Sequence, residues 1–169
     1  MVARRLFGML VGWVALTTAV VPSASAEPVQ RDASYRILWE AFPAYRMVPD
    51  ARDAVRAPAE ADAGRDQWLL RAVGGTVEHP IYQIRNNASQ LCLAPTLRRA
   101  ASSDVAQRPC GTGTEQTWYI DPTGDSYSIT LVADPTRKMY ANKAPGEVPA
   151  VLEGAIADTA QARWIFQRV

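Results

Sequence analysis

Residues 116–120 read Gln-Thr-Trp-Tyr-Ile, and their last three, Trp118-Tyr119-Ile120, begin an apolar segment that occurs three times in the chain. The other two copies are Trp68-Leu69-Leu70 and Trp164-Ile165-Phe166, so the tryptophans are 50 and 46 residues apart. Self-similarity with a period of roughly 20–50 residues is typical of proteins built from repeated units. We therefore expect three structural units of similar length.

A second marker recurs with nearly the same period. Tyr35-Arg36-Ile37, Tyr82-Gln83-Ile84 and Tyr127-Ser128-Ile129 alternate apolar with polar residues, and their tyrosines are 47 and 45 residues apart. Such alternation is typical of a β-strand with one buried face. Each unit therefore begins on a tyrosine-bearing strand and ends on a tryptophan-bearing strand.

Two shorter apolar pieces lie between these markers in every unit, separated by turn-forming residues. They occupy residues 45–48 and 54–56, 91–93 and 104–106, and 138–140 and 150–152. Each unit therefore holds about four short strands, and the chain about twelve. Evenly spaced short strands predict an all-β sandwich or barrel. Threefold repetition favours a closed barrel, which leaves no strand edge exposed.

The first 26 residues have the layout of an export signal. Arg4 and Arg5 precede the uncharged apolar run Leu6–Val21, and small residues follow up to Ala26. The alternative is a membrane anchor, but the run has 16 residues, whereas a spanning helix needs about 20. We therefore predict a signal peptide over residues 1–26 and a secreted protein, exported by either the general or the twin-arginine route.

The charge balance argues against a nucleic-acid partner. Without the signal peptide the chain has 16 basic and 17 acidic side chains, whereas nucleic acids and anionic membranes both favour a strongly basic face. No further segment is long and apolar enough to cross a bilayer. We therefore expect neither nucleic acid nor a membrane as the partner of the mature protein.

The two cysteines, Cys92 and Cys110, predict one disulfide, because an even count in an exported protein favours pairing. Closing this loop would stabilise the fold by about 3 kcal/mol; the alternative is two buried free thiols.

With His79 as the single histidine, no zinc-binding spacing occurs, and we expect no metal and no other cofactor. A hydrolase would have to use His79, which lies beside Pro80 in a predicted loop, so we expect no catalytic residue and no enzyme activity.

Gln116-Thr117-Trp118 is the Q-x-W signature of ricin-type lectin repeats, and looser forms of it occur at Gln67-Trp68 and Gln161-Ala162-Arg163-Trp164. Cys92-Leu93-Ala94, followed by Cys110, resembles the disulfide-bridged repeat of that family. The chain is therefore similar to ricin-type lectins in both its signature and its cysteine pair.

This resemblance extends over nearly the whole mature chain and implies its organisation. It implies a β-trefoil over residues 34–169, with three repeats at about 34–79, 80–125 and 126–169. Residues 27–33 ahead of it are polar, and this composition predicts a flexible lead-in. The resemblance has a further consequence for single residues. It also implies a structural role for the signature: Trp68, Trp118 and Trp164 would fill the core. The amide of Gln116 would tie its turn to neighbouring backbone groups.

The resemblance further implies carbohydrate binding at shallow sites, up to one per repeat. The family places an aspartate two residues after the first cysteine of a repeat, where a carboxylate can accept hydrogen bonds from sugar hydroxyls. In this chain that position is Ala94, and by alignment it is Pro49 and Ala141 in the other two repeats. The second repeat has therefore lost its acid and is expected to be structural.

Four residues remain as predicted sugar contacts. Asp50 and Asn142 lie one residue after the aligned positions, Asp66 precedes the glutamine of the first repeat, and Tyr140 offers an aromatic face. We pair Asp50 with Asp66 in the first repeat and Tyr140 with Asn142 in the third. The alternative for Asp50 and Asp66 is a turn residue and a solvated loop charge.

Two functions are compatible with this pattern. The first is a secreted lectin-type module that binds carbohydrate weakly or with altered specificity. The second is a protein-interaction module on a scaffold that has lost sugar binding, serving as an accessory subunit of a secreted toxin or enzyme, or as an inhibitor. The absence of an acid at Pro49, Ala94 and Ala141 motivates this second hypothesis.

Overall fold

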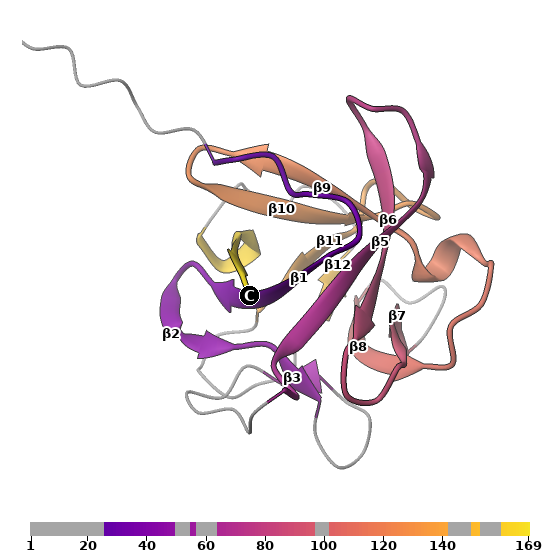
Figure 1. Cartoon of the computed structure of the whole chain (residues 1–169), viewed down its shortest axis with the longest axis horizontal. Coiled ribbons are helices and arrows are strands. Elements are labelled where there is room, and N and C mark those ends of the chain that lie inside the picture. The colour runs from indigo at the N-terminus through magenta and orange to yellow at the C-terminus, as the bar shows by residue number, and fades with distance from the viewer. Residues whose placement is uncertain (1–25, 50–54, 57–63, 97–101, 142–149, 153–159) are drawn as a thin grey trace, which may run out of the picture.

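The computed structural model describes residues 26–49, 55–56, 64–96, 102–141, 150–152 and 160–169. Over these residues most of the chain is β-strand, and six antiparallel strands close into a barrel (Figure 1). Around the ring the strands are β1 (Ala33–Trp39), β5 (Gln67–Gly75), β6 (Pro80–Asn86), β9 (Trp118–Thr123), β10 (Ser126–Leu131) and β13 (Trp164–Arg168), which pairs again with β1. The predicted closed all-β fold is confirmed.

Each repeat adds an outer hairpin to this barrel. The hairpins are β3 (Val48–Pro49) with β4 (Val55–Arg56), β7 (Cys92–Pro95) with β8 (Ser102–Arg108), and β11 (Lys138–Tyr140) with β12 (Ala150–Leu152). The further strand β2 (Phe42–Arg46) pairs with the end of β1, and the 3-10 helices η1 (Thr114–Gln116) and η2 (Ala160–Ala162) precede β9 and β13. Three units of two barrel strands and one outer hairpin make a β-trefoil.

The marker residues occupy matching places in the three repeats. Each marker tyrosine is paired in register with the tryptophan of its own repeat: Tyr35 with Trp68, Tyr82 with Trp118, and Tyr127 with Trp164. All three tryptophan side chains are 0% exposed. Burying a ring of this size stabilises the fold by about 3 kcal/mol, so the three repeats are held together by one shared core.

Residues 26–32 lie across one end of the barrel and contact all three repeats. The marker tyrosines bond to the main chain of this segment: the Tyr35 hydroxyl accepts from the Gln30 amide at 2.8 Å, Tyr82 donates to the Val29 carbonyl at 3.1 Å, and Tyr127 donates to the Glu27 carbonyl. Val29 and Ala26 also pack against the core. We predicted a flexible lead-in here. The structure instead ties the segment down, because phenol hydroxyls at the edge of a core need polar partners.

Both ends of this segment are fixed as well. The Ala26 amide donates to the Gly124 carbonyl at 3.0 Å, and the Asp32 amide donates to the Leu70 carbonyl at 2.8 Å. Asp32 adopts a left-handed φ of 54°, which turns the chain into β1. We call residues 26–32 the N-terminal strap, because they cover one end of the barrel without pairing as a strand.

Residues 1–25, which hold most of the predicted signal peptide, lie outside the described residues, so cleavage after Ala26 stays a prediction. In the part of the chain that the structure describes, no helix has the length and apolar character needed to cross a membrane.

Candidate functional site

Hydrogen bonds from the tryptophans identify equivalent positions in the three outer hairpins. In each repeat the indole N–H donates to a backbone carbonyl at the start of the hairpin: Trp68 to Met47 at 2.8 Å, Trp118 to Leu93 at 3.3 Å, and Trp164 to Met139 at 3.2 Å. Because the same donor makes the same contact three times, the acceptor residues are structurally equivalent.

The residues that follow these acceptors are Val48, Ala94 and Tyr140. From sequence we aligned Pro49 and Ala141 with Ala94, and the structure shifts both positions by one residue. The position at which the family carries its acid is therefore occupied by valine, alanine and tyrosine. None of these three can supply a carboxylate, and only the tyrosine supplies a polar group.

Tyr140 differs from its two equivalents in exposure. Val48 and Ala94 are buried, whereas Tyr140 is half-exposed between the buried Met139 and Ala141. Since successive side chains of a strand point to opposite faces, the ring of Tyr140 is directed away from the core. It offers solvent an aromatic face and a hydroxyl that can both donate and accept. Its predicted neighbour Asn142 lies outside the described residues.

In the first repeat, Asp66 is engaged by two arginines. Its carboxylate is 3% exposed, and Oδ2 accepts from Arg36 Nε at 2.9 Å and from Arg46 Nη1 at 3.0 Å. The carboxylate is therefore not a solvated loop charge, and a sugar hydroxyl would have to displace one of these arginines to reach it. Its predicted partner Asp50 lies outside the described residues.

In the second repeat, the disulfide and the signature glutamine fix the loop before β9. The predicted Cys92–Cys110 bond is confirmed, with the two Cα atoms 5.0 Å apart. The buried side chain of Gln116 donates to the Pro109 carbonyl at 2.9 Å and accepts from the Gly111 amide at 2.6 Å. These contacts hold residues 109–111 on both sides, as expected for an amide that satisfies backbone groups.

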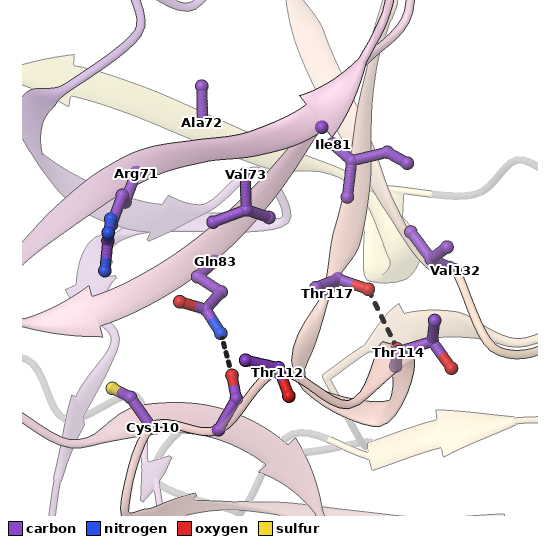
Figure 2. Close-up of a pocket in the computed structure, with 12 residues that line it drawn as sticks. Arg71, Ala72, Val73, Ile81, Gln83, Cys110, Thr112, Thr114, Thr117 and Val132 are labelled. Carbon is purple, nitrogen blue, oxygen red and sulfur yellow. Dashed lines mark hydrogen bonds between the residues drawn. The ribbon is translucent and has the colours of Figure 1, made fainter.

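A cavity of about 700 Å³ lies between this loop and the outward face of the β5–β6 hairpin (Figure 2). Arg71 and Gln83 lie directly opposite each other on the hairpin, and Gln83 Nε2 donates across the cavity to the Gly111 carbonyl at 2.5 Å. Three threonines and three apolar side chains complete most of the lining: Thr112, Thr114, Thr117, Val73, Ile81 and Val132. We call this space the disulfide-side cavity.

No ligand-binding role was predicted for the side chains that line this cavity. The sequence could have predicted that Arg71 and Gln83 point away from the barrel core, because they are polar positions of strands that alternate polar with apolar residues. The sequence could not have predicted that the loop of residues 109–111 faces them, because the position of that loop depends on the Gln83 and Gln116 hydrogen bonds and on the disulfide.

His79 lies exposed at the tip of the β5–β6 hairpin, where its backbone N–H donates to Thr76 Oγ1 at 3.1 Å. The turn depends on Gly75, whose φ of +79° and close approach to the His79 carbonyl leave no room for a Cβ atom. Across the described ranges, no three histidine, cysteine, aspartate or glutamate side chains gather where they could hold a metal ion.

Comparisons with known proteins agree with this architecture. A sequence model described as "Ricin-type beta-trefoil lectin domain-like" matches residues 64–148, half of the chain. No curated protein sequence matches the chain.

Several solved structures share the fold. The designed threefold-symmetric protein ThreeFoil is 14% identical with a TM-score of 0.67, over 82% of this chain and 100% of that chain. The Macrolepiota procera ricin B-like lectin, solved with lactose, is 12% identical with a TM-score of 0.70, over 85% and 100%. A mosquitocidal holotoxin is 14% identical with a TM-score of 0.71, over 83% of this chain and 18% of that chain.

Proposed function

This chain belongs to the family of ricin-type β-trefoil lectin-like domains, and we propose that it is a carbohydrate-binding module whose sugar contact lies at Tyr140. The observation that carries the proposal is the exposure of Tyr140 at a position where its two equivalents, Val48 and Ala94, are buried and apolar. Fold similarity adds general support, since the Macrolepiota procera lectin was solved with lactose.

The other two repeats offer less to a sugar. Ala94 is buried and carries no polar group, and the Asp66 carboxylate is already held by Arg36 and Arg46. A tyrosine ring packs against the C–H face of a sugar, and its hydroxyl can bond to a sugar hydroxyl. One shallow site gives no avidity within a single chain, so we expect weak binding.

The test is glycan-array binding by the purified protein, followed by titration of the best ligand. We expect Tyr140→Ala to lower the affinity for that ligand about tenfold, which corresponds to roughly 1.4 kcal/mol of binding free energy lost with the ring and hydroxyl contacts. Tyr119→Ala is the matched control, because Tyr119 is also half-exposed but lies on β9. It should bind as the unmodified protein does.

Two results would count against this site. Unchanged binding in Tyr140→Ala would move the contact elsewhere on the molecule. Silence across the array, together with a stoichiometric protein partner from the culture medium, would favour the protein-interaction module instead.

We also propose that the protein is exported and cleaved after Ala26. The expected result is that amino-terminal sequencing of the secreted protein begins at Glu27. Cleavage there would remove the Ala26 amide that donates to Gly124 but would keep the three tyrosine contacts of the N-terminal strap, including the Glu27 carbonyl that accepts from Tyr127. A secreted form that begins at any residue other than Glu27 would contradict it.

A further inference from the structure

We propose that the disulfide-side cavity is a second ligand site, which takes an acidic sugar such as a hexuronic acid. The cavity is separate from the contact proposed at Tyr140, since none of Val48, Ala94 and Tyr140 lines it. The two proposals can therefore succeed or fail independently.

The cavity has the size and rigidity of a binding site. Its volume of about 700 Å³ lies within the usual range for small-molecule pockets, roughly 300–1,000 Å³. Its loop wall is held at residues 109–111 by Gln83, by Gln116 and by the disulfide at Cys110. A wall that is already ordered costs little further entropy when a ligand binds.

Charge selects the class of ligand. Among the described residues that line the cavity, Arg71 alone is charged, and no aspartate or glutamate is present. The Arg71 side chain is exposed and makes no ion pair or hydrogen bond with another residue in the part of the chain that the structure describes. A free guanidinium recognises a carboxylate through two parallel hydrogen bonds, so the structure favours an anionic group here.

The rest of the lining suits a ring that carries hydroxyls. The Gln83 amide lies opposite Arg71, and its nitrogen is bonded to Gly111, which leaves its oxygen to accept from a ligand (Figure 2). Thr112 and Thr114 are exposed on the facing loop, and their hydroxyls can both donate and accept. Val73 and Ile81 provide apolar surface for C–H groups. A peptide carboxy terminus would pair with Arg71 but would leave most of the hydrogen-bonding groups on Gln83, Thr112 and Thr114 without a ligand partner.

The experiment titrates the isotope-labelled protein with glucuronate and, as a matched probe, with glucose, and follows backbone amide shifts by NMR. Glucuronate should shift the amides of Gly111 to Thr114 and bind at least about tenfold more tightly than glucose, because a charge-assisted pair contributes at least that factor. Arg71→Gln should abolish this preference. Arg168→Gln, which removes an exposed arginine on β13, should preserve it.

A second variant keeps the test decisive if Arg71→Gln has other effects. Val73→Asp places a carboxylate in the same wall at an exposed position, and it should repel glucuronate while leaving the fold intact. Equal affinity for glucose and glucuronate, or unchanged glucuronate binding in both cavity variants, would overturn the proposal. A stronger response to N-acetylvaline than to glucuronate would also overturn it, in favour of a peptide carboxy terminus.

Discussion

Replacing Trp118 by alanine is expected to lower the free energy of unfolding by about 3–5 kcal/mol. The ring is 0% exposed, and its indole N–H donates to the Leu93 carbonyl at 3.3 Å. The substitution removes buried apolar surface, opens a cavity in the shared core, and leaves a buried carbonyl without its partner. Urea denaturation followed by circular dichroism would measure the loss, since the whole barrel should unfold as one unit.

Two variants separate the contributions to this loss. Trp118→Phe keeps an aromatic ring but removes the indole donor, so it should cost about 1–3 kcal/mol. Tyr119→Ala changes the next, half-exposed residue and should cost about 1 kcal/mol. If Trp118→Ala were no more destabilising than Tyr119→Ala, Trp118 would not be a principal support of the core. The pseudo-threefold arrangement further predicts losses of similar size at Trp68 and Trp164.

The barrel was predictable because its core has strict requirements that leave a mark on the sequence. A closed barrel with pseudo-threefold symmetry needs a large apolar side chain at the same register position in every repeat. The tyrosine and tryptophan markers meet that need, and their pairs fall in register as their common period implies. The disulfide was predictable from the cysteine count, since two cysteines in a chain that is predicted to be exported favour pairing.

The candidate sites were harder to predict, because their positions depend on single-residue differences between repeats. Twelve residues separate Tyr35 from Met47 and Tyr127 from Met139, whereas eleven separate Tyr82 from Leu93. The distance from the marker tyrosine therefore does not fix the hairpin position: the spacing of the second repeat points to Met47 and Met139, one residue before the true equivalents of Ala94, whereas the predicted positions Pro49 and Ala141 lie one residue after them. In a strand, one residue exchanges the buried face for the exposed one.

Long-range contacts explain the remaining differences. Asp66 meets Arg36 and Arg46, which lie 30 and 20 residues earlier in the chain. Nothing in the local sequence around Asp66 indicates that two strands will bring these arginines to it. The N-terminal strap was missed for a different reason. The tyrosines bond to its backbone N–H and C=O groups, which almost every residue has, so no particular residue type marks the strap in the sequence.

Removing residues 27–31 is expected to lower the free energy of unfolding by about 2–3 kcal/mol. The three marker tyrosines would lose their main-chain partners, and a buried hydrogen bond contributes about 1 kcal/mol. Val29 would also leave the core. Thermal or urea denaturation of the truncated protein would measure the change. Gln30→Ala is the matched control, because its side chain is exposed and the Tyr35 bond uses the backbone amide; its stability should be nearly unchanged.

Alkaline pH provides an independent test of the same contacts. Burial raises the pKa of Tyr82 and the pKa of Tyr127, and each phenol must keep its proton to donate to the strap. The folded state therefore favours the neutral phenols. This stabilisation is complete below the unfolded pKa of about 10 and is lost as pH rises through the higher folded values. The protein should accordingly lose stability above about pH 10, and the truncated form should lose less. An equal alkaline loss in both forms would show that the strap does not depend on these hydroxyls.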